Sequence, residues 1–127
     1  MNISLGALVT ITDQKGRSHT VTLESGKQFF TNHGSINHDE ILNAGEGGVV
    51  ASSSGMLYTI FTPALQDFVV GMPRGAAVIY PKDAAQIVEL GDMKPGSKVL
   101  EAGVGSGSLT LHILRTIGDS GSLTSCE

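Results

Sequence analysis

The spacing of apolar residues changes along the chain, from a period of two in the first half to a helical period later. Apolar and polar positions alternate over residues 5–12, and residues 18–23 form a second segment that is rich in threonine and valine. Because successive side chains of a strand point to opposite faces, both segments predict strands. The sequence Asp-Gln-Lys-Gly over 13–16 is typical of a turn, so we expect a hairpin.

Short strand patterns continue to Phe61 and are separated by turns that contain glycine. Residues 28–31 predict a strand that Asn-His-Gly breaks, and residues 36–42 predict a helical turn. Residues 49–52 and 56–61 predict a second hairpin around Ser-Ser-Gly. Many short strands at close spacing are typical of a small barrel or a meander, which we expect to end near Phe61.

A helical period appears in the middle of the chain. The pattern over 62–72 predicts a short helix with Thr62 as its cap. Residues 76–80 are apolar and predict an extended strand that the next residue, a proline, stops. A further helix is expected over 83–90, with Asp83 as its cap.

The last third of the chain has the order strand, glycine-rich loop, helix, strand. Val99 and Leu100 predict a buried strand, and glycines follow at alternate positions. Glycines there allow a sharp turn and a close approach of the backbone to a ligand. The helix after the loop has one apolar face, formed by Leu109, Ile113 and Ile117.

Composition narrows the class of protein. The chain has 127 residues, with 40% hydrophobic and 16% charged residues, as in globular proteins. Its net charge of −4 argues against a general nucleic-acid coat, because such proteins are basic. The single cysteine, Cys126, cannot form an internal disulfide, and no apolar run reaches the length of a membrane span. We therefore expect a cytoplasmic protein.

Three interpretations compete for the glycine-rich loop. A phosphate-binding P-loop requires a lysine and Ser or Thr after its last glycine, but Ser108 and Leu109 follow Gly107, which excludes it. The dinucleotide fingerprint requires its third glycine at the position of Ser108, so that interpretation is weakened but open. An acidic residue followed by alternate glycines and a helix resembles motif I of the class I methyltransferases that use S-adenosylmethionine.

The end of the chain bears on the same choice. Residues 122–126 predict a second short strand, and Glu127 follows at its tip. A carboxylate there can accept hydrogen bonds from two ribose hydroxyls, and its separation from Gly103 is close to the usual spacing of about 20 residues. The alternative is that Glu127 is an ordinary solvated residue.

Five segments resemble one known family over nearly the whole chain. They are residues 26–34, 38–39, 72–75, 79–88 and 99–110. Together they resemble the tRNA adenine-N1 methyltransferases that modify the T-loop adenine. The sequence Tyr-Pro-Lys-Asp in the fourth segment is more specific than the glycine-rich loop.

The resemblance implies an α+β fold. Residues 1–61 would form a small N-terminal β domain, residues 62–80 a connector helix and strand, and residues 81–127 the start of a Rossmann-like class I methyltransferase domain with its first two strands. It also implies S-adenosylmethionine-dependent methylation of adenine N1 in tRNA by a homo-oligomer, a tetramer in the family. The family's catalytic aspartate lies further on, so the chain resembles the N-terminal half, and we expect it to be inactive alone.

The resemblance further assigns residues to two sites. Those expected to contact the cofactor are Val78, Ile79, Tyr80, Ala102, Gly103, Val104, Gly105, Ser106, Gly107, Ser108, Leu109 and Glu127. Those expected to face tRNA are Gln28, Phe29, Phe30, Thr31, Asn32, His33, Gly34, Ser35, Gly55 and Met56. No catalytic residue and no metal site is assigned.

Simpler explanations stay open for several residues. Tyr80 could be a half-buried aromatic residue that closes a strand. His33 and His38 could bind a metal ion, but no third ligand accompanies them, and loop histidines are usually solvated. Three cations could contact phosphate, although nearby acidic residues make ordinary surface charge the simpler account: Lys15, Arg17 and Lys27.

Two other functions also stay open. The chain could be a non-catalytic module, either a tRNA-binding β domain or a partner subunit, in which the glycine motif is structural. It could also belong to a methyltransferase with another substrate, because motif I is shared widely.

Overall fold

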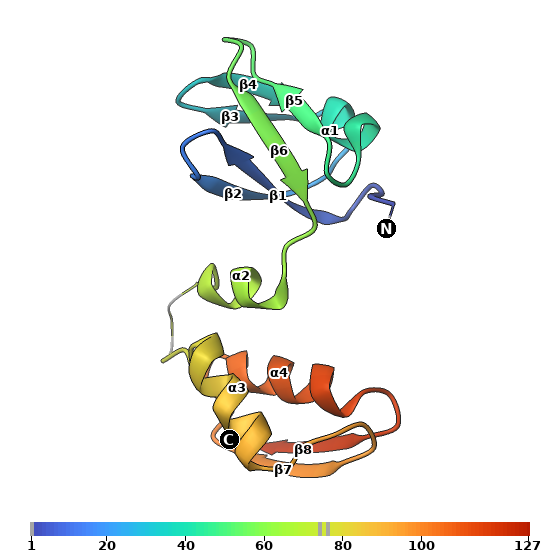
Figure 1. The fold of residues 1–127 in the computed structure, drawn as a ribbon, viewed down its shortest axis with the longest axis vertical. Coiled ribbons are helices and arrows are strands. Elements are labelled where there is room, and N and C mark those ends of the chain that lie inside the picture. Colours follow the sequence, from blue (N-terminus) through green and yellow to red (C-terminus); the bar gives the residue numbers. More distant parts are fainter. Residues whose placement is uncertain (1, 74, 76) are drawn as a thin grey trace. The chain divides into compact units, whose positions relative to one another are not determined.

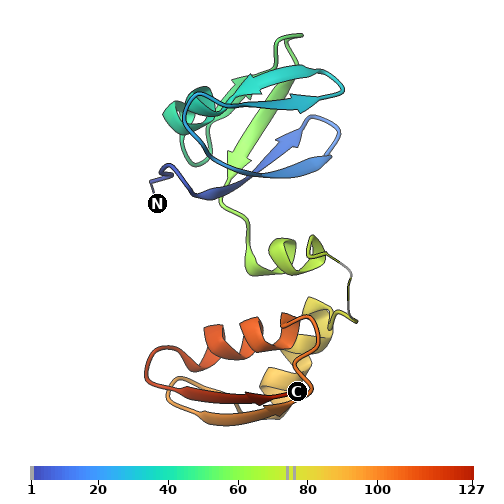
Figure 2. The same cartoon turned by 180° about the vertical axis from the view of Figure 1, so that it is seen from behind.

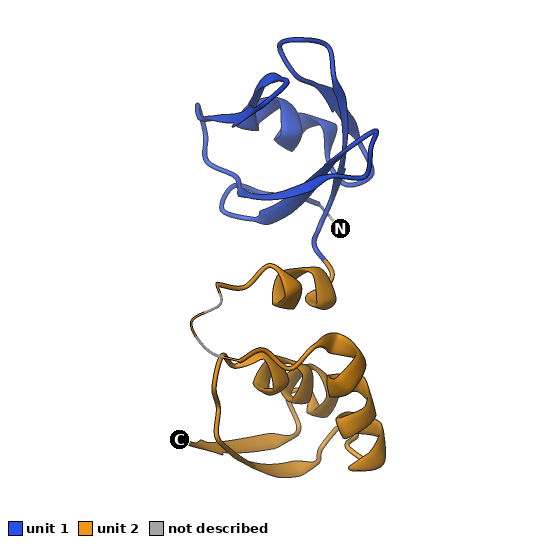
Figure 3. Cartoon of the chain, turned by 90° about the vertical axis from the view of Figure 1, so that its left-hand side faces the viewer, with its two compact units in different colours: residues 1–63 blue, residues 64–127 orange. Residues whose placement is uncertain are grey.

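The chain has two compact units, each with its own strands and helices. The structure is a computed structural model that describes residues 2–73, 75 and 77–127. The units are Met1–Pro63 and Ala64–Glu127, coloured separately in Figure 3. Strands dominate the first unit and helices the second, so the predicted α+β class is confirmed. In the described part of the chain, no helix is both long enough and apolar enough to cross a membrane.

Four strands of the first unit form one antiparallel sheet in the order β2-β1-β6-β5 (Figure 1). These strands are β1 (Leu8–Asp13), β2 (Ser18–Thr22), β5 (Val49–Ala51) and β6 (Leu57–Phe61). Both predicted hairpins, β1–β2 and β5–β6, are confirmed. The sheet is not a meander, because β6 pairs with β1 across a long stretch of sequence.

A second antiparallel pair follows β2 in the same unit. It consists of β3 (Gln28–Thr31) and β4 (Gly34–Asn37), and α1 (His38–Ala44) comes directly after it. The prediction of a helical turn from residue 36 is wrong at its start, because Ile36 pairs with Phe29 in this hairpin. The Asn-His-Gly sequence therefore reverses the chain and does not end the sheet structure.

The core of the first unit comes from alternate residues of its strands. Val9 and Ile11 of β1 are fully buried, which confirms the alternation predicted over 5–12. Burial of each large apolar side chain contributes about 1.5–3 kcal/mol. The other buried apolar residues of this core are Val21, Leu23, Ile36, Ile41, Val50, Tyr58 and Ile60.

The second unit starts with α2 (Leu65–Val70), and its cap differs from the predicted one. The N-cap residue is Ala64, whose N–H donates to the Asp67 carboxylate at 3.2 Å. Thr62 instead belongs to the first unit, where its hydroxyl donates to the Glu46 carboxylate at 2.6 Å. The prediction of Thr62 as the cap is wrong because this carboxylate binds it.

Two further predictions in the middle of the chain are wrong. Residues 77–80 are not in a strand, because no strand of the described chain pairs with them, and Ala76 lies outside the described residues. Helix α3 (Pro81–Leu90) begins two residues before the predicted cap. Pro81 takes the first helical position, which needs no N–H donor, and Asp83 lies in the first turn.

The last three elements form a parallel β-α-β arrangement. They are β7 (Lys98–Ala102), α4 (Ser108–Ile117) and β8 (Ser122–Cys126). Parallel neighbours require a crossover connection, and α4 provides it along one face of the pair (Figure 1, and from behind in Figure 2). This is the predicted start of a Rossmann-like domain.

One face of the β7–β8 pair is uncovered. The prediction of a buried strand is wrong for Leu100, which is 72% exposed, while Val99 is half-buried. Glu101 is the buried residue of β7 and faces α4. Because side chains alternate along a strand, a helix on one face buries only every second residue.

The turn between β3 and β4 yields a test of the first unit. Gly34 has φ 95°, and an added Cβ would collide with the Ser53 hydroxyl and lie 3.1 Å from the backbone nitrogen of Ser54. We expect Gly34→Ala to lower the free energy of unfolding of this unit by about 2 kcal/mol or more, since the left-handed backbone alone costs about 1–2 kcal/mol. Urea unfolding, followed by amide exchange at Ile11, measures it.

Gly26→Ala is the matched control for this substitution. Gly26 has φ 75°, but an added Cβ there would meet no atom within 4 Å. It should show the backbone cost alone, so equal losses in the two variants would contradict the contact argument.

Candidate functional site

The glycine-rich loop begins at the carboxyl end of β7. Gly103, Gly105 and Gly107 have φ values of 85°, 56° and 83°, which other residues rarely adopt. An added Cβ at Gly103 or Gly107 would meet no atom within 4 Å, and at Gly105 the nearest atom is the Ala77 carbonyl oxygen at 3.7 Å. The loop therefore combines a glycine-dependent backbone with open space beside it, so a ligand can approach the main chain.

The start of this loop is fixed beside the tip of β8. The Gly103 N–H donates to the Cys126 carbonyl oxygen at 2.7 Å, and Ala102 lies opposite Cys126 in the parallel pair. Glu127 follows Cys126 and is exposed. In open α/β sheets, ligands bind at the carboxyl ends of the strands, so Gly103 and Glu127 lie at the edge where a ligand is expected.

The segment before α3 is tied to the helix that follows the loop. Ser108, the first residue of α4, is buried, and its hydroxyl donates to the Ile79 carbonyl oxygen at 2.5 Å. The Ser106 hydroxyl accepts the Ser108 N–H at 3.3 Å. The structure thus brings the predicted 78–80 and 102–109 segments together, although they are distant in sequence.

Glu101 holds the two ends of the loop in place. Its buried carboxylate accepts hydrogen bonds from the Thr110 hydroxyl at 3.0 and 2.8 Å and from the Ser125 hydroxyl at 2.8 Å. These bonds connect β7 with α4 and β8. Sequence reasoning identified only an acidic residue before the glycines, because nothing local marks the two hydroxyl partners.

The other expected cofactor residues lie along the same stretch of the second unit. Ala102 is exposed at the end of β7, and Val104 and Leu109 are half-buried. Tyr80 is 41% exposed. All of the expected cofactor residues belong to the second unit and all of the expected tRNA residues to the first.

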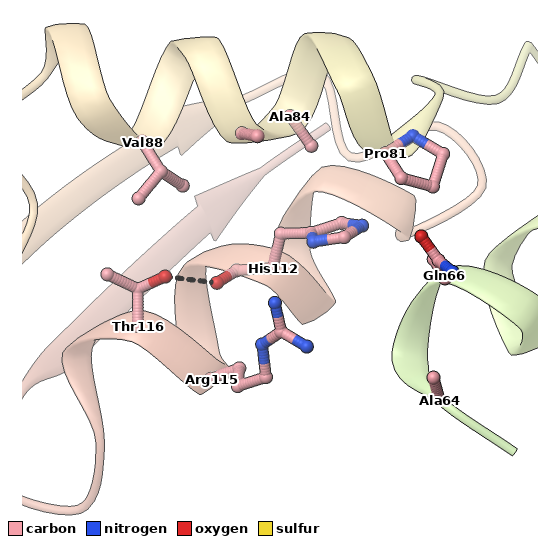
Figure 4. A pocket seen from close by; sticks show the side chains of 9 residues that line it. Ala64, Gln66, Pro81, Ala84, Val88, His112, Arg115 and Thr116 are labelled. Atoms are coloured by element: carbon pink, nitrogen blue, oxygen red, sulfur yellow. Dashed lines mark hydrogen bonds between the residues drawn. The ribbon is translucent and has the colours of Figure 1, made fainter.

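A separate cavity of about 400 Å³ lies among α2, α3 and α4 (Figure 4). Its lining contains none of the expected cofactor residues: Ala64, Gln66, Pro81, Ala84, Ala85, Val88, His112, Arg115 and Thr116. His112 is 6% exposed, and its Nε2 has no hydrogen-bond partner in the described chain. Burial, and then the nearby Arg115 cation, hold the pKa of His112 below its usual value.

The expected tRNA segment lines a second cavity, of about 260 Å³, in the first unit. Its walls come from the β1–β2 and β3–β4 hairpins and from β6: Asp13, Arg17, His19, Phe29, Phe30, Thr31, Asn32, His33 and Tyr58. Residues 29–33 were expected to face tRNA. Arg17 was weighed only as a possible phosphate contact, with ordinary surface charge as the simpler account, and His19 was not singled out, because their neighbours across the cavity come from a different hairpin.

The remaining expected tRNA residues serve the structure of this region. The Gln28 side chain donates to Asn37 at 2.8 Å. The Ser35 N–H donates to the Ser53 hydroxyl at 3.0 Å, and the Ser35 carbonyl oxygen accepts the Ser53 N–H at 2.8 Å. Gly55 and Met56 lie in the β5–β6 hairpin, where Met56 packs against the core. None of these residues lines the cavity.

The buried Asp13 carboxylate holds the Arg17 side chain of this cavity in place. Asp13 accepts the backbone N–H groups of Arg17 and Lys15, at 2.9 and 2.8 Å, and the Arg17 Nε–H at 3.1 Å. These hydrogen bonds, the Arg17 backbone bond foremost, hold the pKa of Asp13 below its usual value. The Arg17 Nη2 also lies 3.3 Å from the His33 Nε2.

The two histidines weighed as metal ligands have separate protein partners. The buried His38 accepts the Glu24 N–H through Nδ1 at 3.0 Å, whereas His33 contacts Arg17. Among the described residues, no three side chains of the ligating types are grouped closely enough to hold a metal ion.

Two family models match the chain in succession. A model described as TrmI-like N-terminal matches residues 2–50, and one described as tRNA methyltransferase complex GCD14 subunit matches residues 55–127. The second match covers more than half of the chain.

Curated relatives and solved structures agree with these matches. The chain is 43% identical over 115 residues to the tRNA (adenine(58)-N(1))-methyltransferase TrmI of Thermus thermophilus, covering 91% of this chain and 45% of that protein. It is 27% identical to the catalytic subunit TRM61 of Candida albicans, covering 98% and 38%. The chain thus spans less than half the length of the curated relatives it matches.

Among solved structures, a SAM-dependent O-methyltransferase from Thermotoga maritima superimposes with a TM-score of 0.92 at 30% identity, covering 96% of this chain and 46% of that one. The tRNA (m1A58) methyltransferase TrmI from Aquifex aeolicus superimposes with a TM-score of 0.77 at 24% identity, covering 93% and 46%, which supports the fold alone.

The buried histidine predicts a pH dependence for the second unit. Because the pKa of folded His112 lies below its ordinary value of 6.5, the unfolded chain takes up the proton first as the pH falls. The free energy of unfolding should be constant above about pH 7 and should decrease below 6.5, by at most about 1.4 kcal/mol per pH unit. Hydrogen exchange of the Ile113 amide at several pH values measures this decrease.

His112→Gln is the control, since it removes the titrating group and should abolish the decrease. The other histidines lie in the first unit: His19, His33 and His38. A decrease that persists in His112→Gln would show that another group causes it.

Proposed function

Because the chain belongs to the family described as tRNA methyltransferase complex GCD14 subunit, we propose that it supplies the S-adenosylmethionine-binding part of a tRNA (adenine-N1)-methyltransferase. The observation that carries this proposal is the loop over 103–107, which lies between β7 and α4 with Glu127 at the tip of the neighbouring strand. The complete enzyme corresponds to more than these 127 residues, since the chain spans 45% of the Thermus relative.

The residues at this loop fit S-adenosylmethionine. The ligand carries no phosphate, so it needs close contact with the backbone and no Lys-Ser pair after the glycines. Gly103 and Gly107 leave open space where side chains would stand. Glu127 provides an exposed carboxylate that can accept both ribose hydroxyls, and Ile79 and Tyr80 would border the cofactor from the segment tied to Ser108.

When bound, the cofactor supplies an electrophilic methyl group on a sulfonium sulfur. The part of this chain is to hold that group in line with the adenine N1 lone pair, because methyl transfer gains most from fixed attack geometry. The Glu101 hydrogen bonds to Thr110 and Ser125 keep the loop in one conformation for this purpose. No residue of the chain is assigned as an acid or base.

The expected tRNA residues would position the substrate. Adenine N1 lies on the Watson–Crick edge, so the base must turn out of the folded tRNA before its N1 can react. Residues 28–35, with Gly55 and Met56, are the proposed contacts. The net charge of −4 means that this contact depends on local groups and not on the general charge of the chain.

The proposed partners are tRNA and other copies of the chain, because the resemblance to the tRNA adenine-N1 methyltransferases implies a tetramer. A cytoplasmic location stays a prediction. A second candidate function is a non-catalytic subunit of such an enzyme, which is favoured by the match to a family of tRNA methyltransferase complex subunits. Methylation of an oxygen atom is a further alternative, raised by the name of the Thermotoga structure.

The activity can be tested by joining this chain to the C-terminal half of the Thermus relative. With S-adenosylmethionine and unmodified tRNA, we expect 1-methyladenosine in a digest of the tRNA, whereas the 127-residue chain alone should transfer no methyl group. Mass spectrometry of the nucleosides measures both results.

The folding of the joined protein is checked by its thermal unfolding with and without S-adenosylhomocysteine. A folded protein that binds this ligand but methylates no tRNA would support the non-catalytic alternative. Methylation of another atom would contradict the assignment of adenine N1.

Two glycines with similar φ values separate cofactor binding from folding. Gly105 has φ 56° and lies in the loop, whereas Gly118 has φ 62° and ends α4. Alanine should cost the backbone about 1–2 kcal/mol at Gly105 and at least as much at Gly118, whose ψ of −171° lies in a region that other residues rarely adopt. We expect Gly105→Ala to weaken S-adenosylhomocysteine binding at least tenfold, because its methyl group occupies the space of the ligand.

Gly118→Ala should leave the affinity unchanged within about twofold, because its added methyl group lies in open space. Isothermal titration calorimetry of the two variants makes the comparison. Equal affinities for both would contradict the proposed position of the cofactor.

A further inference from the structure

The cavity among α2, α3 and α4 has an apolar wall on one side and hydrogen-bonding side chains on the other (Figure 4). Its volume of about 400 Å³ is typical of a small-molecule site. It lies within the second unit, and none of the residues expected to contact the cofactor or tRNA lines it. We call it the helix cavity and define it by Gln66, Ala84, Ala85, Val88, His112 and Arg115.

Small residues of α3 create the apolar wall. Ala84 and Ala85 are neighbours, and Val88 follows one turn later, so the three side chains border the cavity from one face of the helix. Longer side chains at the two alanine positions would fill part of the space between α3 and α4. The wall therefore suits an alkyl or aromatic group, which gains free energy on leaving water.

The buried imidazole of His112 supplies the polar side. Only 6% of the residue is exposed, and its Nε2 has no hydrogen-bond partner in the described chain. Buried polar atoms of native proteins are nearly always paired, and an unpaired one costs free energy. Figure 4 shows the ring projecting from α4 toward Pro81 and Gln66. Gln66 and Arg115 are exposed and can change rotamer, so a ligand that enters beside them can reach the ring.

The charge of the helix cavity favours an anion. Arg115 lies one turn after His112, and none of the ion pairs in the described part of the chain involves it. No lining residue is acidic, and α2 and α3 contribute no charged side chain to the lining. Burial, and then Arg115, hold the pKa of His112 below its usual value, so its imidazole is neutral at neutral pH and carries one N–H donor.

We propose that the helix cavity binds a small organic carboxylate with an apolar body. The carboxylate accepts hydrogen bonds from the His112 Nε2–H and from the Arg115 guanidinium, and the apolar body packs against Ala84, Ala85 and Val88. Inorganic phosphate suits the cavity less well, because one side is apolar and only one cation is present. This proposal does not depend on the proposed function, since no expected cofactor residue takes part.

The test uses benzoate as the probe in NMR titrations of the whole isotope-labelled chain. We expect benzoate to shift the signals of the His112 imidazole nitrogens and of the Val88 methyl groups. Benzamide has the same shape without the charge, and inorganic phosphate has the charge without the apolar body. Both should bind at least about tenfold more weakly than benzoate, because each lacks either the charge-assisted hydrogen bonds or the apolar contact.

Two variants test the groups that bind the carboxylate. His112→Phe keeps an aromatic ring but removes the N–H, so we expect it to remain folded and to weaken benzoate binding by about tenfold. Arg115→Gln should weaken binding to a similar extent and reduce its dependence on salt. Lys98→Gln is the matched control, because it also removes an exposed cation of the second unit but lies outside the cavity, so the affinity should stay within about twofold of the parent value.

Amide exchange at Ile113 shows whether each variant is folded. The proposal is overturned if folded His112→Phe binds benzoate as the parent does, or if benzamide or phosphate binds as tightly as benzoate. Displacement of benzoate by S-adenosylhomocysteine would also overturn it, because benzoate would then occupy the cofactor site.

The same titration on the joined protein distinguishes a free ligand from a segment of protein. We expect the joined protein to bind benzoate as the chain does. Loss of binding there would show that the C-terminal half fills the helix cavity, and it would overturn the proposal. Neither result depends on methyl transfer, so a failure of the proposed function would leave this proposal standing.

Discussion

Parallel pairing of β7 with β8 is the constraint on which the candidate cofactor site depends. It sets the carboxyl ends of two strands side by side, so that Gly103 bonds to Cys126 and Glu127 emerges next to the loop. A parallel pair has no tight turn, so the chain leaves this edge through the glycine-rich loop and enters the crossover helix α4 there, at Ser108. The Thr110 and Ser125 hydroxyls donate to the buried Glu101 carboxylate and thereby connect β7 with α4 and β8.

The two units use different means of stabilisation. The first unit encloses a core within two sets of antiparallel strands, and it contains a cavity lined by residues of both sets. In the second unit α4 packs against the two-stranded sheet and α3 packs against α4, and Leu100 is exposed. The cavity of the first unit is lined by strands and turns of its hairpins, while the candidate cofactor site of the second unit follows the ends of strands.

Much of the fold could be predicted because its signals are local. Alternation identified β1, and the glycines, the α4 face and the following strand identified the β-α-β arrangement. The errors arose where contacts with residues distant in sequence determine the local structure. Glu46 binds Thr62, which therefore does not cap α2, and Ile36 pairs with Phe29 in a hairpin instead of starting a helix. At the sites, the glycine loop was evident from sequence, but the positions of Glu101 and Arg17 depend on contacts between separate elements. No local pattern encodes such contacts.

The serine turn of the β5–β6 hairpin has a consequence for recognition. The His33 carbonyl oxygen accepts the Ser52 hydroxyl at 2.5 Å and also the Ser54 hydroxyl. This double attachment restricts the rim of the cavity in the first unit before any partner arrives, so association there costs little conformational entropy. Ser52 and Ser54 would thereby influence the dissociation rate of a molecule bound at this cavity through the backbone of His33. Substitution of either serine would change the dissociation rate more than the association rate.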